Sequence, residues 1–544
     1  MNAGLPMTET KPAEPAPVDR DWWRGAVIYQ IYPRSFRDSD GDGVGDLRGA
    51  IEKLDYVKSL GVDAIWLSPF FRSPMKDYGY DVSDYCDVDP LFGTLADADA
   101  LIARAHKLGL KVIIDQVWSH TSDRHPWFID SRADRLNAKA DWYVWADAKP
   151  DGAPPNNWQA MFGGPSWTWD ARRGQYYLHN FLPEQPDLNV RHPAVQEALL
   201  NAGRFWLERG VDGFRMDVVN FLIADAMLRD NPPLAPEHAP PRPHQFQRHV
   251  YDRTQPETLD FIARLRALLD EYGAFAVGEI EDEEPLKVQR DYTDGPERLN
   301  TAYSFFLLRT REMTPQIVRE AMAQWRGAKG WPSWSFSNHD VIRFPTRLAG
   351  DDPQRAKLML ALLLALRGTA FLYQGDELGL PHAQVPYERL RDPEAITFWP
   401  QGIGRDGART PMPWSRDAHM AGFTDAQDAW LPLDPRHRAL AADAQEADSA
   451  SMLAFTRAMI ALRRDSAALR LGAFTALEAA APLLAFMRDA GAERMLCLFN
   501  LGPAPIRYAL PPGAGAVRLA VGGAELGGAS ASLAGFSGLF VDVT

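Results

Sequence analysis

Short apolar runs alternate with longer amphipathic stretches from residue 27 to about residue 465, and this alternation limits the possible folds more than any other feature. Such runs predict strands and such stretches predict helices. Eight parallel strands with right-handed crossovers favour a closed (β/α)8 barrel over an open doubly wound sheet. The predicted strands are Val27–Tyr32, Ala64–Ser68, Lys111–Val117, Gly213–Val219, Ala274–Ile280, Tyr303–Leu308, Ser333–Asn338 and Ala370–Gln374. The predicted helices are 51–60, 97–108, 194–209, 257–272, 314–326, 352–367 and 451–464.

Two parts of the chain depart from this alternation. Residues 120–189 are rich in Trp, Asp, Gly and Pro and show little periodicity, which predicts a subdomain inserted after the third strand. After residue 468, short apolar runs separated by Gly and Pro predict a small antiparallel β domain. We therefore expect an α/β chain with four parts, of which the barrel is formed by two segments. They are a disordered tail at 1–20, a barrel at 21–119 and 190–468, an inserted subdomain at 120–189 and a β domain at 469–544.

Composition excludes several classes of protein. The net charge of −14 argues against nucleic-acid binding, because phosphate neutralisation needs a basic surface. Two cysteines allow at most one disulfide and favour a reducing compartment. No signal peptide or membrane span is recognisable, so we expect a cytoplasmic protein without membrane partners, either monomer or homodimer. The 17 tryptophans either fill the core or line a site that stacks on flat ligand faces.

Polar residues stand where four predicted strands end. Asp115 and His120 end the third strand, Arg215 and Asp217 the fourth, Glu279 the fifth, and His339 and Asp340 the seventh. The carboxyl ends of parallel barrel strands meet at one mouth, where barrel enzymes carry their active sites. Buried charges must be paired or hydrogen-bonded, so a structural role for all of them together is the weaker explanation.

Three carboxylates around one cleft suit cleavage of a glycosidic bond. One ionised carboxylate acts as nucleophile, a second is kept protonated as acid, and a third stabilises the developing positive charge. Arg215 lies two residues before Asp217, so both side chains project to the same side of the strand. Its positive charge favours the ionised form of Asp217.

These motifs resemble glycoside hydrolase family 13, the α-amylase superfamily, and within it the oligo-1,6-glucosidase/α-glucosidase branch. The resemblance covers nearly the whole chain, and six separated motifs agree in order. It implies Asp217 as nucleophile, Glu279 as general acid/base and Asp340 as transition-state stabiliser. The segment Gln185-Pro-Asp-Leu-Asn189 is typical of this branch and not of the endo-acting amylases.

The resemblance also implies a set of sugar-binding residues. Asp77 binds the terminal glucose, Tyr80 stacks under its ring, and Arg409 pairs with Asp77 to close the pocket, which gives exo action. His120, Arg215 and His339 match sugar-binding positions, and Trp118 and Phe181 lie by motif near the pocket. One departure is Ser119, where the family has Asn, so that a neighbour or water must fill the missing contact.

The acidic segment 38–46 predicts a cation site. Acidic side chains at Asp38, Asp40, Asp42 and Asp46 alternate with glycines, a pattern that suits a hard cation, although an acidic surface turn is the alternative. The branch resembled binds Ca²⁺ here, with Mg²⁺ as a second possibility, through these carboxylates and the Val44 carbonyl. We expect a structural ion and no organic cofactor.

Two features bear on the substrate. Val218 follows the nucleophile, and in the resembled branch Val at this position accompanies α-1,6 preference, whereas Ala or Thr accompanies α-1,4 preference. The connection 220–256 carries seven prolines between residues 232 and 256 and is either a stiff wall or a disordered insertion. As a wall it would narrow the acceptor side, so that short sugars or small alcohols are accepted and long glucans are excluded.

The leading hypothesis is a retaining exo-acting α-glucosidase that releases glucose from short α-glucosides, with transglucosylation to sugar or alcohol acceptors. The alternative within the family is a sucrose isomerase or trehalose synthase. Sucrose isomerases carry an Arg-Leu-Asp-Arg-like loop, which the segment 341–346 lacks. A non-catalytic barrel, like the ectodomains of amino-acid-transporter heavy subunits, is disfavoured because all three carboxylates are present.

Overall fold

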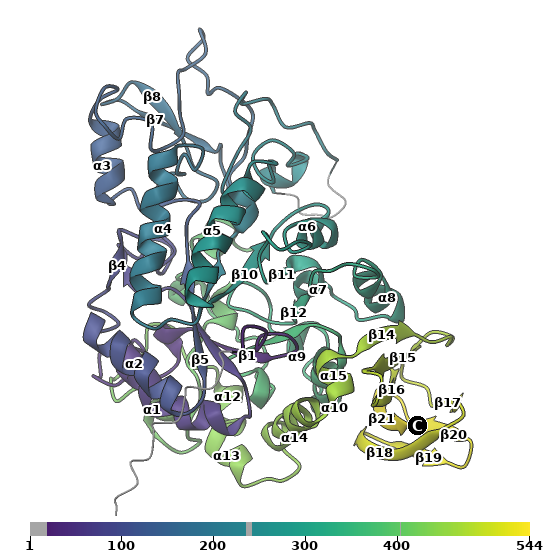
Figure 1. Cartoon of the computed structure of the whole chain (residues 1–544). Coiled ribbons are helices and arrows are strands. Elements are labelled where there is room, and N and C mark those ends of the chain that lie inside the picture. Colours follow the sequence, from purple (N-terminus) through teal and green to yellow (C-terminus); the bar gives the residue numbers. More distant parts are fainter. Residues whose placement is uncertain (1–18, 236–241, 403) are drawn as a thin grey trace, which may run out of the picture.

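The computed structural model describes residues 19–235, 242–402 and 404–544 (Figure 1). The predicted disordered tail at 1–20 lies outside the described residues except for Asp19 and Arg20. The same holds for residues 236–241 of the proline-rich connection.

A closed parallel barrel forms the centre of the molecule. Its strands are β1 (Val27–Ile31), β2 (Ala64–Leu67), β5 (Lys111–Gln116), β9 (Gly213–Met216), β10 (Phe275–Ile280), β11 (Thr301–Ser304), β12 (Ser333–Ser335) and β13 (Thr369–Tyr373). The strand order is β11-β10-β9-β5-β2-β1-β13-β12, with every pair parallel. A parallel bridge between Ala302 and Pro332 joins the two ends of this order. The predicted (β/α)8 barrel is therefore confirmed.

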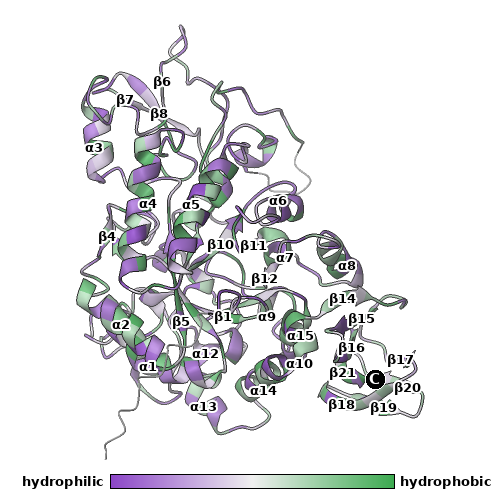
Figure 2. Ribbon diagram, in the orientation of Figure 1, coloured by the Kyte–Doolittle hydropathy of each residue, from purple (hydrophilic) through white to green (hydrophobic). Residues whose placement is uncertain are grey.

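Amphipathic helices cover the outside of the barrel. Helices such as α2 and α4 carry both hydrophobic and hydrophilic residues (Figure 2), and their buried residues recur at helical spacing. The long helices are α1 (Leu47–Ser59), α2 (Leu95–Lys107), α4 (Pro193–Glu208), α5 (Thr258–Tyr272), α10 (Pro353–Ala365) and α14 (Met452–Asp465). The shorter ones are α6 (Pro285–Asp291), α7 (Phe305–Arg309), α8 (Pro315–Ala323), α9 (Phe344–Arg347), α11 (Pro393–Phe398), α12 (Pro435–Ala439), α13 (Ala442–Glu446) and α15 (Ala467–Leu471).

The sixth strand is shorter than predicted. It ends at Ser304, and the apolar residues that follow form helix α7. An apolar run without a clear period does not distinguish a buried strand from a buried helical turn, which explains the error. In α7 the side chains of Leu307 and Leu308 are buried, and Phe305 faces the central cavity.

The region between β5 and β9 carries its own small sheet. Helix α3 (Pro126–Ala133) precedes the strands β6 (Trp145–Ala146), β7 (Trp167–Asp170) and β8 (Gln175–Leu178), which pair in the order β6-β8-β7. Trp158 and Trp167 stack at 6.1 Å inside this region and are nearly fully buried. Trp158 and Trp167 are thus core residues, whereas Trp169 is exposed. A short hairpin, β3 (Phe71–Arg72) with β4 (Asp84–Val88), precedes α2.

The C-terminal segment forms two antiparallel sheets beside α10, α14 and α15 (Figure 1). The larger has the order β14-β15-β16-β21-β18, and the smaller β17-β20-β19. Their bounds are β14 (Ala473–Ala476), β15 (Leu483–Asp489), β16 (Arg494–Asn500), β17 (Ile506–Ala509), β18 (Ala514–Val521), β19 (Ala524–Gly527), β20 (Ser530–Leu533) and β21 (Ser537–Val543). The predicted antiparallel sheet domain is confirmed.

Two further expectations concern chemistry outside the site. Cys86 and Cys497 are both free thiols, so the single bridge that the cysteine count allows is not formed. Across 19–235, 242–402 and 404–544, no helix is both long and apolar enough to cross a membrane.

Candidate active site

A cavity of about 720 Å³ opens at the carboxyl ends of the barrel strands. Asp217 directly follows β9, Glu279 is the last residue but one of β10, and Asp340 follows β12, so each strand carries one carboxylate to the same mouth. All three carboxylates line the cavity. Of the other sequence-predicted residues, the cavity wall contains Asp77, Tyr80, His120 and Phe181.

Arg215 connects three of the carboxylates. Its guanidinium lies 2.7 Å from Asp115, 2.6 Å from Asp217 and 2.5 Å from Glu279. Its Nε donates to the hydroxyl of Tyr303, which in turn donates to Glu279 Oε1 at 3.1 Å. The arginine is fully buried, so its charge is balanced inside the protein and not by solvent. Asp217 and Glu279 are therefore held on one planar group.

Burial and charge act in opposite directions on the pKa values of Asp217 and Glu279. Burial raises the pKa of Asp217 to about 7, although Arg215 lowers it. Burial also raises the pKa of Glu279 to about 8, again against the effect of Arg215, with the charges of Asp217 and Asp340 adding to the rise. Glu279 holds its proton to higher pH than Asp217.

Val218 adopts a backbone conformation that β-branched residues rarely adopt. Its φ and ψ are 30° and 52°, in the left-handed region, and non-glycine residues held there are costly and concentrate at functional sites. The turn brings the backbone N–H of Val218 to 3.4 Å from Glu279 Oε2. Since Oε1 already accepts from Tyr303 and pairs with Arg215, Oε2 is the better position for a proton.

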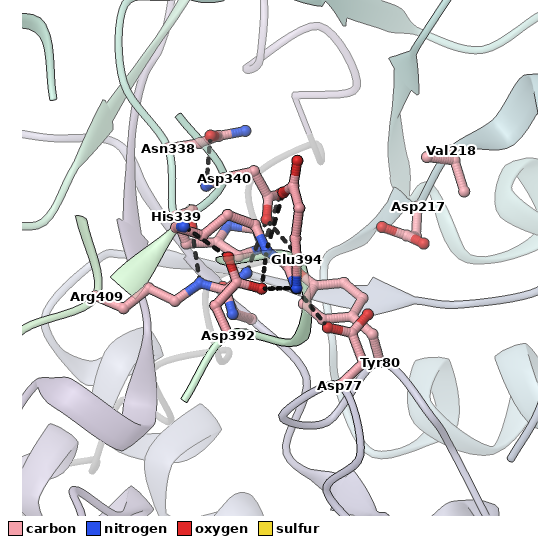
Figure 3. A network of polar contacts seen from close by, with 12 residues as sticks. Asp77, Tyr80, Asp217, Val218, Asn338, His339, Asp340, Asp392, Glu394 and Arg409 are labelled. Atoms are coloured by element: carbon pink, nitrogen blue, oxygen red, sulfur yellow. Dashed lines mark hydrogen bonds and ion pairs between the residues drawn. The ribbon is translucent and has the colours of Figure 1, made fainter. Parts of the chain in front are cut away.

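The pKa of Asp340 is shifted in the opposite direction, below its usual range. Arg409 donates to it at 2.8 Å and His339 Nε2 lies 3.1 Å away. Figure 3 shows these contacts and the carboxylate of Asp217 that faces them. Burial would raise the pKa of Asp340, but His339, Arg409, Arg405 and Arg215 lower it below its usual range. Asp340 is therefore ionised in the resting site.

His339 is fixed in one tautomer. Gln30 Nε2 donates to its Nδ1 at 2.8 Å, so Nε2 carries the proton toward Asp340 and the hydroxyl of Tyr80. The pKa of His339 lies well below its usual value, mainly because the ring is buried. Tyr80 stacks on this ring at 5.3 Å with nearly parallel planes and lines the cavity.

The partner of Asp77 is Arg405, not Arg409 as predicted. Arg405 lies 2.8 Å from Asp77 and 2.8 Å from Asp392, whereas Arg409 donates to Asp340 and to the carbonyl of His339. The segment Arg405-Asp-Gly-Ala-Arg409 offers two arginines four residues apart, and spacing alone does not distinguish them. Arg405 is thus a site residue that the sequence reasoning missed.

The side chain of Ser119 contacts His120. Its hydroxyl lies 2.9 Å from His120 Nδ1, and His120 Nε2 lies 3.0 Å from the carbonyl of Tyr80 and 3.1 Å from Gln185 Nε2. The ring therefore has polar contacts on both of its nitrogens. Burial lowers the pKa of His120 to about 4, which keeps the ring neutral. Phe181 packs against His120 at 5.2 Å.

The cavity is lined by tyrosine and phenylalanine side chains, and no tryptophan is among its described lining residues. Trp118 is fully buried against Phe214 and Phe261 and does not line the cavity, so the expectation for it is wrong. The aromatic residues of the wall are Tyr80, Phe162, Phe181, Phe221 and Phe305.

The proline-rich connection contributes part of the cavity wall. Arg242, His244 and Gln245 line the cavity beside Phe221, and Arg242 pairs with Glu394, which also lines it. We call the part of the cavity wall formed by Val218–Phe221, 242–245 and α7 the outer wall. The described part of the connection is thus built into the site.

The acidic loop holds three carboxylates together. Ligand atoms of Asp38, Asp40 and Asp42 lie within 4.8 Å of one another. Asp38 organises the turn, because its two oxygens accept from the backbone N–H groups of Asp40, Gly41 and Gly43. Asp46 instead caps α1 through Gly49, and its oxygens also accept from Ser39. The carboxylate of Asp46 does not belong to the close cluster.

Known proteins match this chain over most of its length. The model of the α-amylase catalytic domain matches residues 30–472. A probable α-glucosidase of Rhizobium meliloti (strain 1021) is 53% identical, covering 91% of this chain and 92% of that protein. An oligo-1,6-glucosidase of Parageobacillus thermoglucosidasius is 36% identical, covering 91% and 93%.

A solved structure agrees with these relatives. The α-glucosyl transfer enzyme XgtA superposes with a TM-score of 0.92 at 51% identity, covering 96% of this chain and 99% of that one. Sequence, fold and the converging carboxylates point the same way. The chain belongs to the α-amylase family and is a glycoside hydrolase.

Proposed function

We propose that the protein is a retaining, exo-acting α-glucosidase that also transfers glucose to acceptors. The observation that carries this proposal is the Arg215 cluster. One guanidinium holds Asp217 and Glu279 together while Glu279 keeps its proton to higher pH. A nucleophile and an acid with separated pKa values, held close to each other, are what double displacement requires.

The reaction then follows from the geometry. Asp217 attacks the anomeric carbon while Glu279 donates its proton to the leaving oxygen, which breaks the glycosidic bond and leaves a glucosyl ester on Asp217. Glu279, now ionised, takes a proton from water, and the resulting hydroxide releases glucose with its original configuration. Asp340, kept ionised by Arg409 and Arg405, stabilises the positive charge that develops on the sugar.

Exo action is supported by the closed end of the cavity. The ion pair of Asp77 and Arg405 stands beside Tyr80 and His120, and Arg405 is further tied to Asp392. A charged pair of this kind offers hydrogen bonds to the hydroxyl groups of one terminal glucose and leaves no passage for a longer chain.

The outer wall receives the leaving group or the acceptor. Its side chains at Val218, Phe221 and Phe305 are apolar, and the paired Arg242 and Glu394 narrow the opening. We infer that short sugars and small alcohols enter and long glucans do not. Val218 favours α-1,6 over α-1,4 linkages. The difference in transition-state binding energy between the two substrates is about 1–3 kcal/mol at most.

A second candidate function is glucosyl transfer as the main reaction. The likeness to the α-glucosyl transfer enzyme XgtA favours it, since its 51% identity is close to that of the probable α-glucosidase. The same glucosyl ester serves both reactions, and the competition between water and an acceptor decides which one dominates.

Product analysis over maltose, isomaltose, sucrose and trehalose tests these proposals. We expect glucose from maltose and isomaltose, released as the α-anomer by NMR, with transfer products that increase with acceptor concentration. Release of the β-anomer would overturn the retaining mechanism. Similar rates on maltose and on soluble starch would overturn the narrowed acceptor side, and rearranged disaccharides without free glucose would favour an isomerase.

We also propose a structural Ca²⁺ at the acidic loop, with Mg²⁺ as the alternative ion. Asp38, Asp40 and Asp42 supply the hard oxygen ligands that these ions prefer. The loop follows β1 and contributes no residue to the cavity wall, so the ion would stabilise the fold and take no part in catalysis. The free cysteines support a reducing, cytoplasmic location.

A further inference from the structure

A compact polar cluster in the connection 242–256 takes no part in the mechanism above. Buried Asp252 accepts from His249 Nδ1 at 2.6 Å and from Arg253 at 3.2 Å. His249 Nε2 lies 2.8 Å from the backbone carbonyl of His244, and the two imidazole rings stack with centroids 3.7 Å apart. We call these four residues the His244 cluster. The contacts fix the position of His244 within a segment that is otherwise rich in proline.

Arg253 links the cluster to the cavity wall. Its guanidinium lies 4.1 Å from the ring centroid of Phe221, a residue of the outer wall, and its NH2 lies 2.8 Å from His244 Nε2. An arginine only donates hydrogen bonds, so His244 Nε2 must accept. A neutral imidazole whose Nε2 accepts carries its proton on Nδ1.

The surroundings of His244 favour this neutral form. Burial, Arg253 and His249 together hold the pKa of His244 well below its usual value. The contacts of His249 to the Asp252 carboxylate and to the carbonyl of His244 hold the ring that stacks on His244 in place. His244 therefore presents a fixed N–H donor.

His244 is also part of the cavity wall. It lines the cavity beside Phe221, Gln245 and Phe305, and among the residues that the structure describes its Nδ1 has no hydrogen-bond partner. The contacts of Nε2 and of the ring are consistent with a structural role for His244. They leave the Nδ1–H group without a partner in the described part of the chain. Apolar surfaces with a few placed polar groups are what gives a ligand site its orientation.

We propose that His244 is a specificity-determining residue of the acceptor side, whose Nδ1–H donates to a hydroxyl group of the acceptor or leaving sugar. The proposal rests on the proposed glucosidase function. It names the ligand class as a polyhydroxylated acceptor, because a second hydroxyl besides the reacting one is needed to reach His244. A monohydric alcohol reacts without this contact.

The test separates acceptor binding from the earlier chemistry. With α-glucosyl fluoride as donor, the leaving fluoride makes no use of the outer wall, and every variant starts from the same glucosyl ester. H244F keeps a stacked ring but removes the donor. Its rate of α-glucosyl fluoride hydrolysis is the reference to which its transfer to each acceptor is normalised. The glucose concentration for half-maximal transfer should rise about three- to tenfold, the effect of one hydrogen bond. Transfer to ethanol should change less than about twofold.

Two matched substitutions sharpen the result. The side-chain amide of asparagine stands near the Nδ1 position, so H244N should restore part of the preference for glucose. The longer H244Q places its amide near Nε2 and should not. F246A changes an exposed neighbour in the same turn and should behave as wild type. If H244F does not fold, as judged by its thermal unfolding, the comparison of H244N with H244Q carries the test.

Two outcomes would overturn the proposal. One is an equal change for glucose and ethanol in H244F, which would indicate a general structural effect. The other is a glucose concentration for half-maximal transfer that is unchanged in H244F, or that is the same in H244N and H244Q. Failure of the wild-type protein to hydrolyse α-glucosyl fluoride would instead overturn the proposed function and is distinguishable from both.

Discussion

The guanidinium of Arg405 lies 2.8 Å from the carboxylate of Asp77, across 328 residues of sequence. The same guanidinium reaches Asp392 at 2.8 Å and Asp340 at 3.4 Å. Asp340 is one of the three carboxylates that we propose as catalytic, so this contact connects the Asp77 end of the cavity to the proposed centre of the reaction. Asp77, the proposed contact of the terminal sugar, and Asp340, the proposed stabiliser of charge, thus share one cation.

Substitution of Arg405 should therefore impair catalysis even when the positive charge is kept. In R405K a single ammonium cannot reproduce the forked contacts to Asp77 and Asp392. Each lost charged hydrogen bond is worth about 1.5–3 kcal/mol, so we expect kcat/KM on maltose and isomaltose to fall about 100-fold. R391K, in the same segment and exposed, is the matched control and should keep wild-type activity. More than half of the wild-type kcat/KM in R405K would contradict the assignment.

The pH dependence of kcat/KM should be bell-shaped and narrow. The active form needs Asp217 ionised and Glu279 protonated. With the pKa of Asp217 raised to about 7 and that of Glu279 to about 8, activity should decline below about pH 7 and again above about pH 8. E279Q should lose the alkaline limb together with most of its activity on maltose. A flat profile from pH 5 to 9 would show that these carboxyls do not control the reaction.

Replacement of Glu279 by glutamine should stabilise the fold at alkaline pH. The folded state raises the pKa of Glu279 from 4.5 to about 8, so the favourable contribution of this carboxyl is complete below about pH 4.5 and is lost as the pH rises through 8. Glutamine cannot ionise, and E279Q should gain about 2–4 °C in Tm at pH 8 and little at pH 5. E525Q, at an exposed position in β19, should show no such difference in thermal unfolding. An equal Tm for E279Q and wild type at both pH values would count against the raised pKa.

Loss of the Ser119 hydroxyl should weaken glucose binding moderately. The hydroxyl contacts His120 Nδ1, and without it this nitrogen loses its polar contact and the ring is held less firmly. We expect S119A to reduce kcat/KM about 3–10-fold, mainly through KM, as the loss of one hydrogen bond predicts. S119N supplies another donor and should retain most of the activity. If S119A matched wild type in steady-state kinetics, the contact would have no functional role.

The acidic loop predicts a calcium-dependent Tm. Addition of Ca²⁺ to protein treated with EDTA should raise Tm by a few degrees, because binding to the folded state alone stabilises it. D40N should abolish the increase, whereas D417N, an exposed carboxylate outside the loop, should leave it unchanged. A D40N protein that still responds to Ca²⁺ would place the ion elsewhere.

The sequence was sufficient for features that follow from periodicity and strand ends. Eight alternating units imply the barrel, and polar residues at the ends of β9, β10 and β12 meet at one mouth in any such barrel. Asp217, Glu279 and Asp340 could therefore be named without a structure. The helix at Phe305–Arg309 could not, because its apolar run has no decisive period.

Contacts between distant loops could not be predicted from the residues. Whether Arg405 or Arg409 faces Asp77 depends on how the loop after β13 folds back over the barrel, and both arginines are near enough in sequence to serve. Tyr303 was likewise not singled out, although its hydroxyl joins Arg215 to Glu279. The expectation for Trp118 failed because a residue two positions before His120 packs into the helical layer and not into the cavity.

The two sides of the cavity have separate origins in the chain. The proposed glucose-binding residues Asp77, His120 and Asp340 lie in the loops after β2, β5 and β12, whereas the outer wall comes from the connection after β9 and from helix α7. Under the proposed function, insertions or exchanges in the connection would therefore alter which acceptor is used without disturbing the recognition of glucose. A few substitutions in the connection after β9 would then be enough to change acceptor preference during evolution. The same segment is the one to randomise in directed evolution.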